Sequence, residues 1–290
     1  MKDTGYWVIR TYVSGNVGEK IKYFIPGVKP KNKRQYKSDI RKQEQNFYSS
    51  ERNLARLINA NYKAGDVILG LDFSDEGLSF VERRAESFGG EKRACTCAQK
   101  HIMPEDEEEM MQAVRDAAEH ELRLAIRRVK RECKKREIDF KVIAITSDMD
   151  GETGEAVRVH HHLIVTKEVA EIFRDKWHMG GSFVETMRRQ EDYTEIAHYF
   201  ISQVRKIPDS KKYISSRNLV RPKPVDRAVT SGAEVRVPKG CKLLFRSEYN
   251  EHRPQYIRYY ITPQDNPSTA DAVPIPLHKG GFEDEFVMRE

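Results

Sequence analysis

The stretch FKVIAITSDMDGETGEAVRVHHHLIVT, residues 140–166, decides the fold. Its two ends, Phe140–Thr146 and Val157–Thr166, are runs of β-branched and aliphatic residues of the kind that form buried strands. The polar link between them is rich in Asp, Gly, Ser and Thr, which favour turns. We therefore expect an antiparallel hairpin, and a sheet that contains it is mainly antiparallel rather than doubly wound and parallel.

The segments around this hairpin predict further strands and helices. Residues 67–73 (VILGLDF) form a short apolar run with a glycine inside it, typical of a buried strand. Residues 74–103 lack periodicity, so we expect a long loop or a small insertion there. The fold class that follows is α+β, an antiparallel β-sheet with helices packed on it. Helical patterns occur at 105–137, 167–177 and 192–206, and a short strand is expected at 182–187.

Two parts of the chain lie outside this predicted sheet. At the start, residues 6–13 and 20–25 predict a β-hairpin, and the amphipathic pattern of 38–60 predicts a helix. Towards the end the sequence becomes basic and proline-bearing, with strand-like pieces at 242–245 and 256–261. We therefore divide the chain into an N-terminal hairpin and basic helix (1–62), a central domain (63–215) and a basic C-terminal extension with a frayed tail (216–290).

The composition sets broad limits on function. The 290 residues include 51 Lys and Arg against 45 Asp and Glu, and the net charge of +6 with a pI near 9.0 suits a polyanionic partner. No stretch approaches the roughly 18 consecutive apolar residues of a membrane helix, and the first residues lack the pattern of a secretory signal. We expect a cytoplasmic protein with no membrane partner, whose four cysteines are not a disulfide framework.

Three consecutive histidines in the run VRVHHHLIVT are the strongest chemical signal. Side chains alternate along a strand, so His160 and His162 project from one face and His161 from the other. Two imidazoles on one face are half of a metal site, which a carboxylate near a neighbouring strand completes; we favour Asp148 over Asp72. The alternative is that the histidines only fill surface or core positions. Their spacing matches neither a histidine-triad hydrolase nor the HExxH helix of zinc proteases.

The segment DYTEIAHYFISQVRK, residues 192–206, adds a candidate nucleophile. At about 100° per residue its apolar side chains form one arc that includes Tyr193, whereas Tyr199 lies roughly 130° from the centre of that arc, among polar residues. A lone tyrosine in such a place is usually a surface residue. Opposite a metal site it becomes a candidate nucleophile, because a cation stabilises the phenolate of a group whose ordinary pKa is near 10.

The strand VILGLDFS, the strand VRVHHHLIVT and the helix YTEIAHYFISQVRK, in this order, resemble the three motifs of the HUH endonuclease superfamily. The match covers residues 67–224. It is similar in particular to the replication-associated proteins, the rolling-circle replication initiators, of phages, plasmids and mobile elements of Gram-positive bacteria. The downstream ISSRNLVRPKP also resembles a segment that follows the tyrosine helix in such proteins. The resemblance implies an HUH/RRM-like palm and a location in the cytoplasm of a bacterial host cell.

The same resemblance implies metal-dependent, sequence-specific nicking and joining of single-stranded DNA. His160 and His162, with Asp148, would hold a Mg²⁺ or Mn²⁺ ion against the scissile phosphate. Tyr199 would attack that phosphate and leave a 5′-phosphotyrosine link and a free 3′-hydroxyl. The implied partners are single-stranded DNA or a DNA hairpin at a replication origin, with the host helicase and polymerase.

The chain departs from the family pattern four residues after the candidate nucleophile. Relatives have Tyr or Lys there and this chain has Gln203, which favours a single nucleophile; Lys206, on the same helix face, could supply the missing positive charge. Basic residues on either side of the central region would contact phosphates without reading the sequence. They are Lys31, Lys33, Arg34, Lys37, Arg217, Arg221 and Lys223.

Two other functions stay open at this point. A DNA-binding module on the same fold that has lost cleavage agrees with Gln203 and with the missing glutamate that relatives carry before the histidines. A zinc-binding structural protein would use Cys95, Cys97 and His101 with Cys133. CxC spacing is weak evidence for zinc, and free thiols explain these cysteines better.

Overall fold

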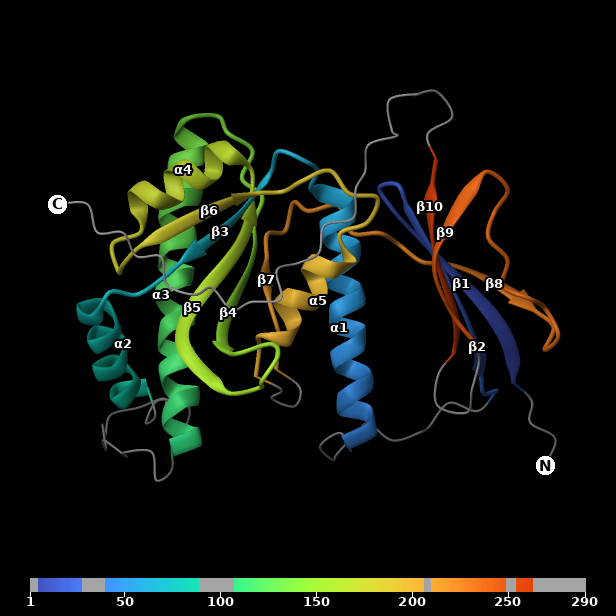
Figure 1. Cartoon of the computed structure of the whole chain (residues 1–290), viewed down its shortest axis with the longest axis horizontal. Coiled ribbons are helices and arrows are strands. Elements are labelled where there is room, and N and C mark those ends of the chain that lie inside the picture. Colours follow the sequence, from blue (N-terminus) through green and yellow to red (C-terminus); the bar gives the residue numbers. More distant parts are fainter. Residues whose placement is uncertain (1–4, 28–39, 89–106, 206–209, 249–253, 263–290) are drawn as a thin grey trace.

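Over residues 5–27, 40–88, 107–205, 210–248 and 254–262, which the computed structural model describes, the chain forms five helices and two antiparallel five-stranded sheets (Figure 1). This arrangement confirms the α+β class expected from the sequence. No helix in this part of the chain is long and apolar enough to cross a membrane.

The first sheet contains the predicted histidine hairpin. Strand β5 (Ala156–Val165) is at its centre, between β4 (Ile143–Met149) and β3 (Val67–Leu71). The hairpin is confirmed, but β4 begins and ends later than expected, so Ser147 and the two residues after it belong to the strand and not to the link. With β6 (Ser182–Thr186) and β7 (Ile214–Ser215), the order is β6-β3-β5-β4-β7, antiparallel throughout.

Helices cover both faces of this sheet (Figure 1). Leu163 and Val165 of β5 point into one core and Ile164 into the other, because side chains alternate along a strand. Both faces are apolar, so each needs a helical cover. The covering helices are α3 (Glu107–Lys135) and α4 (Lys167–Lys176) on one face, and α1 (Ile40–Asn61) and α5 (Thr194–Ser202) on the other.

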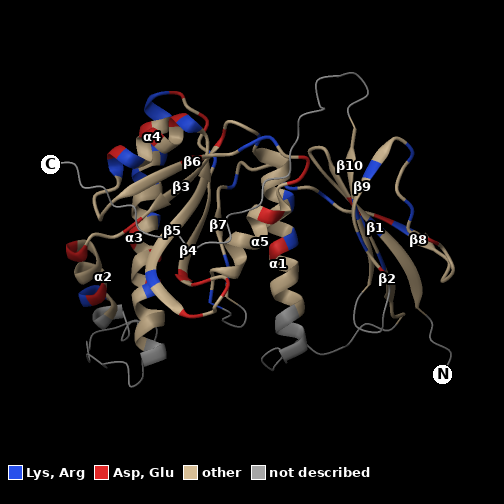
Figure 2. Ribbon diagram, in the orientation of Figure 1, with Lys and Arg blue, Asp and Glu red and all other residues tan. Residues whose placement is uncertain are grey.

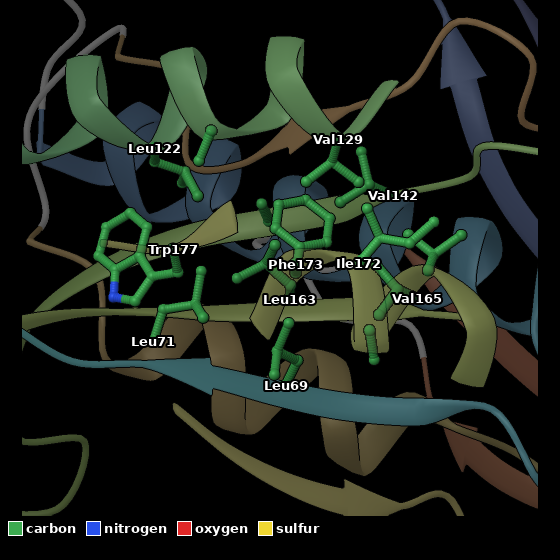
Figure 3. Close-up of a cluster of buried hydrophobic side chains, with 14 of the residues drawn as sticks. Leu69, Leu71, Leu122, Val129, Val142, Leu163, Val165, Ile172, Phe173 and Trp177 are labelled. Atoms are coloured by element: carbon green, nitrogen blue, oxygen red, sulfur yellow. The ribbon is translucent and has the colours of Figure 1, made fainter. Parts of the chain in front are cut away.

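The core under α3 and α4 confirms the helical pattern predicted for residues 105–137. Leu122 and Val129 of α3 are fully buried and lie across from Phe173 of α4, with Leu163 of β5 beside them (Figure 3). A buried leucine or phenylalanine contributes about 1.5–3 kcal/mol relative to its exposed state. This core therefore supplies much of the stability of the first sheet.

Part of the expected long loop is a helix. Helix α2 (Asp75–Phe88) has acids in its first turn, and Ser74 Oγ accepts a hydrogen bond of 3.1 Å from the backbone N–H of Gly77. Among its described side chains, Val81 and Ala85 are the fully buried ones. Two buried positions make too narrow a stripe for clear periodicity, which explains why the sequence pattern missed this helix.

The second sheet joins segments from the two ends of the sequence. Strands β1 (Tyr6–Ser14) and β2 (Val17–Ile25) form the predicted N-terminal hairpin, and Gly15 in its turn has a φ of +59°, which glycine adopts without strain. The strand-like pieces predicted near the other end are also strands, and β10 (Gln255–Ile261) pairs with β2. The order is β8 (Val225–Val229), β1, β2, β10 and β9 (Cys241–Ser247).

Helix α1 lies between the two sheets (Figure 1). On one side, Leu54 and Ile58 are fully buried in the core that α1 shares with α5. On the other side, Arg56 forms a buried, two-pronged ion pair with Glu19 of β2, with N–O distances of 3.0 and 2.7 Å. The helix therefore connects the second sheet to the layer that contains α5.

Candidate active site

Two histidines of the central strand converge on one point. His160 and His162 project from the face of β5 that α5 covers, and their Nε2 atoms are 3.1 Å apart. His161 points into the opposite core, where its ring lies against the rings of Phe73 and Trp177. The alternation of the three side chains expected from the sequence is confirmed.

The backbone contact of His160 decides which form of its neutral ring faces His162. His160 Nδ1 lies 2.9 Å from the carbonyl oxygen of Arg158, which can only accept, so Nδ1 carries the proton of the neutral ring and Nε2 carries the lone pair. His162 is 2% exposed, and burial, aided by His160 beside it, lowers its pKa to about 3. His162 is therefore neutral at physiological pH, which is the form that binds metals.

Aromatic rings enclose His162. Phe200 of α5 stacks on it with ring centroids 5.5 Å apart, and Phe183 of β6 lies edge-on at 6.2 Å. Gly70 of β3 pairs with both His162 and Phe183. It makes room for the ring of Phe183, since a Cβ at position 70 would come within 1.8 Å of that ring. These rings exclude water from His162 and fix its orientation.

Tyr199 lies beside the histidine pair. Its ring centroid is 5.8 Å from that of His162, and the side chain packs at the margin of the core shared by α1 and α5. Burial raises the pKa of the phenol, and a hydrogen bond with Gln203 opposes the rise. The phenol is therefore protonated at neutral pH and must lose a proton before it can act as a nucleophile. The helix that carries it, α5, is shorter than predicted.

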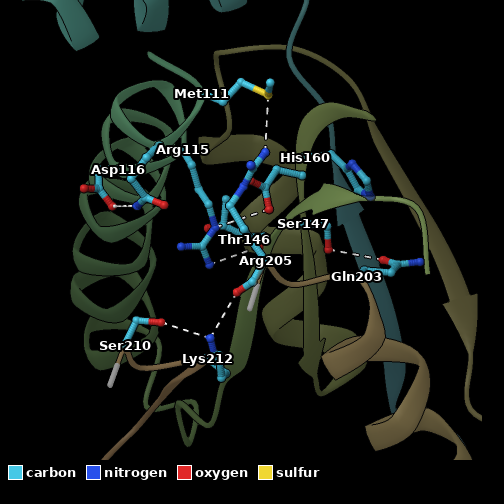
Figure 4. Close-up of polar contacts among 12 residues, drawn as sticks. Met111, Arg115, Asp116, Thr146, Ser147, His160, Gln203, Arg205, Ser210 and Lys212 are labelled. Atoms are coloured by element: carbon cyan, nitrogen blue, oxygen red, sulfur yellow. Dashed lines mark hydrogen bonds and ion pairs between the residues drawn. The ribbon is translucent and has the colours of Figure 1, made fainter. Parts of the chain in front are cut away.

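Gln203 connects the end of α5 to the strands. Its Oε1 accepts a hydrogen bond of 3.2 Å from Ser147 Oγ, and Ser147 stands opposite His160 in the β4–β5 register (Figure 4). Gln203 also acts on the pKa values of Tyr199 and His162, in each case against the effect of burial. One neutral amide therefore influences both the candidate nucleophile and a candidate metal ligand.

Asp148 does not join the histidines, which corrects its choice from the sequence as the third ligand. It follows Ser147 in β4, so its side chain projects to the opposite face. There its two oxygens lie 3.0 Å from Arg205 Nε and 3.5 Å from Arg115 Nε. Within the described residues, no group of three or more His, Cys, Asp or Glu side chains is placed to hold a metal ion.

The two imidazoles nevertheless fit two positions of a metal's coordination shell. Nitrogens that bind one ion at about 2.1 Å are about 3.0–3.4 Å apart at the usual bond angles, and the Nε2 atoms of His160 and His162 are 3.1 Å apart. Imidazole ligands favour a transition-metal ion over Mg²⁺. The remaining positions would be taken by water or by oxygens of a substrate.

The other residues selected from the sequence are only partly described. Arg217, Arg221 and Lys223 are exposed and lie between β7 and β8. Figure 2 colours the basic residues of the ribbon blue. Cys133 is fully buried in the core under α3, where burial raises the pKa of its thiol. Outside the described residues lie Lys31, Lys33, Arg34, Lys37, Lys206, Cys95, Cys97 and His101.

Sequence reasoning missed two groups at this site. Ser147 was assigned to the link and not to the strand, so its contact with Gln203 was not expected. Phe183 was not considered, although the glycine inside VILGLDF signals a close approach of another group to the strand. No family model matches the chain, and no curated protein or solved structure matches it either.

Proposed function

We propose that the protein is a metal-dependent nickase and strand transferase for single-stranded DNA, with Tyr199 as its nucleophile. The observation that carries this proposal is the placement of the Tyr199 ring 5.8 Å from His162, whose Nε2 is 3.1 Å from that of His160. A phenol next to two converging imidazole nitrogens is the arrangement that metal-assisted attack on a phosphodiester needs.

The proposed reaction exchanges one phosphodiester for another. The phenolic oxygen of Tyr199 forms a bond to phosphorus, and the bond from phosphorus to the 3′-oxygen breaks. The phenol loses its proton and the leaving 3′-oxygen gains one, so the products are a 5′-phosphotyrosine and a free 3′-hydroxyl. Attack of a 3′-hydroxyl on this link reverses the step and joins strands, and neither direction needs ATP.

The residues of the site divide this work. His160 and His162 would hold a Mn²⁺ or Mg²⁺ ion, which when bound neutralises charge on the phosphate oxygens. Gln203 counters the rise that burial causes in the pKa of the Tyr199 phenol. Because glutamine is not a nucleophile, the site has a single covalent position, and a two-tyrosine exchange is not available to it.

A covalent protein–DNA link with a free 3′-hydroxyl suits the start of rolling-circle replication of a phage, plasmid or mobile element. A host polymerase extends the 3′-end while a helicase separates the strands. The DNA partner is a single strand or hairpin at a replication origin, read sequence-specifically. Exposed Arg217, Arg221 and Lys223 would contribute phosphate contacts that position the strand.

The test is covalent capture of DNA. The protein, Tyr199→Phe and Tyr193→Phe are incubated with labelled single-stranded oligonucleotides and Mn²⁺, then separated on a denaturing gel. Wild type and Tyr193→Phe should carry label that chelator abolishes, and Tyr199→Phe should carry none. Tyr193 is the matched control because it is on the same segment but its hydroxyl donates to the carbonyl of Arg188. Label on Tyr199→Phe would overturn the assignment.

A second candidate is a DNA-binding module that does not cleave. It is favoured by the missing third ligand among the described residues and by the raised pKa of Tyr199. Salt-dependent binding of single strands without any adduct, across a diverse oligonucleotide pool, would support this candidate over the nickase.

A further inference from the structure

Asp192, two residues before the start of α5, is held from two directions. Asp192 Oδ1 accepts hydrogen bonds of 2.9 Å from the backbone N–H of Thr194 and from Asn59 Nδ2 of α1. Its other oxygen forms an ion pair with Arg258 of β10, in the second sheet. The start of the helix that carries Tyr199 is therefore attached to both α1 and the second sheet.

The Asp192–Arg258 ion pair is largely shielded from water. The two side chains are 10% and 19% exposed, whereas the nearby Lys242–Glu191 pair is 62% and 30% exposed. An exposed pair contributes little because water screens it, while removal of one partner from a shielded pair leaves an unpaired charge. Of these two ion pairs, the Arg258 pair is the one that restrains position.

The restraint acts on a short helix. α5 has nine residues, and at 1.5 Å per residue Tyr199 lies only about 7.5 Å along the axis from the first helical residue, Thr194. A shift or rotation of the start of the helix therefore displaces the phenol by a similar amount. Asn59 adds a second fixed point, because its Oδ1 accepts the backbone N–H of Tyr193 at 2.9 Å.

We propose that Arg258 is a positioning residue for the nucleophile, acting through Asp192 to place Tyr199 against the histidine pair. This inference rests on the proposed nicking function. It gives the second sheet a part in the rate of the reaction that is separate from any part in DNA binding, because Arg258 touches neither Tyr199 nor the histidines in the described structure.

The experiment measures single-turnover nicking with saturating DNA, and DNA affinity separately, by fluorescence anisotropy. Arg258→Gln should lower the rate about 10- to 100-fold, because a displacement of about 1 Å costs up to about 100-fold, while the dissociation constant stays unchanged. Arg258→Lys, which keeps the charge, should restore most of the rate. Arg246→Gln on β9, whose partner is Glu248, is the matched control and should react like wild type.

Several outcomes would overturn the inference. They are an Arg258→Gln rate equal to that of wild type, a parallel loss of rate and affinity, which would indicate a direct DNA contact, and no rescue by Arg258→Lys. If Arg258→Gln does not fold, Asp192→Asn tests the same contact, since an amide retains the acceptor for Thr194 but loses the ion pair. It should show the same loss of rate, and a wild-type rate would overturn the inference.

Failure of the proposed function gives a different pattern. In that case wild type itself forms no adduct, whatever residue occupies position 258. The positioning role is then read from hydrogen exchange of the amides in α5, which should become faster in Arg258→Gln and not in Arg246→Gln. Unchanged exchange in Arg258→Gln would overturn the positioning role as well.

Discussion

The two sheets have the same number of strands but are stabilised in different ways. The first has helices on both faces and two continuous apolar cores. The second, in the described part of the chain, has a small core whose buried members are Val235, Ile257 and Tyr259. Its contacts with the rest of the molecule include the buried ion pair of Glu19 with Arg56, and Arg56 also lies over the ring of Tyr12.

The two parts of the candidate site depend on different kinds of contact. The histidines belong to the centre of the first sheet, where close packing leaves them one arrangement. The tyrosine belongs to a helix that also depends on polar contacts with the second sheet. A single substitution of charge breaks such an ion pair, so we expect the position of Tyr199 to be easier to alter than that of the histidines.

The largest effect is expected in the first sheet. Phe173→Ala removes a fully buried ring and should lower the free energy of unfolding by about 3–5 kcal/mol. Chemical denaturation measures this loss in the whole protein. The counterpart is Ile257→Ala, which truncates a fully buried side chain of the second sheet. It should speed hydrogen exchange mainly at the amides of that sheet. Equal exposure of both sheets in the two variants would contradict the contrast.

A smaller effect is expected at the link between the sheets. Arg56→Met leaves Glu19 buried without its partner and should cost about 3 kcal/mol. Amides of β1 and β2 should then exchange faster than those of β5. The double variant Glu19→Gln with Arg56→Met should regain part of the loss, because no charge is left unpaired. Loss of protection in β5 to the same extent would show that the sheets open together.

Substitution of Asp148 tests whether polar contacts also contribute to the stability of the first sheet. Asp148→Asn weakens the contacts with Arg115 and Arg205 and should cost about 2 kcal/mol, the scale of a hydrogen bond to a charged group. Its affinity for Mn²⁺, measured by calorimetry, should equal that of wild type. His160→Gln is the comparison and should weaken that affinity. A stable Asp148→Asn with weakened Mn²⁺ binding would restore the aspartate as a ligand.

The smallest effect is expected at the exposed edge of the second sheet. The hydrogen bond from Arg10 lowers the pKa of Asp226, so the pair stabilises the fold above the ordinary carboxyl pKa of about 3.9, and the contribution is lost as the pH falls through the lowered value. Asp226→Asn should cost less than about 1 kcal/mol at pH 7 because both side chains are exposed. The difference from wild type should shrink towards pH 2, and a growing difference would contradict this account.

Local patterns made much of the fold predictable. The alternation around His161, the turn residues before the histidine strand and the apolar stripe of α3 each depend on neighbours in sequence, and each is confirmed. The pairing of β10 with β2 was not predictable in this way. A β pattern identifies a strand and its buried face, but not the distant strand that forms its hydrogen bonds.

The same distinction, between local patterns and contacts of distant segments, applies to the candidate site. The convergence of His160 and His162 follows from strand periodicity, and helical periodicity predicted that Tyr199 lies away from the centre of the apolar arc of its helix. The error over Asp148 came from ending the strand at Thr146, since extension by even two residues decides which face a side chain takes. The contact of Gln203 with Ser147 depends on how α5 packs on β4, which no local pattern encodes.

The pairing of β2 with β10 also sets an order of events during synthesis. About 230 residues separate the end of β2 from the start of β10, and at roughly 5–20 residues per second the N-terminal hairpin waits roughly 10–50 s for that neighbour. Every strand of the first sheet emerges before then. We therefore expect the strand of the histidines to have its neighbours before β10 is made, whereas Asp192 acquires Arg258 only with β10.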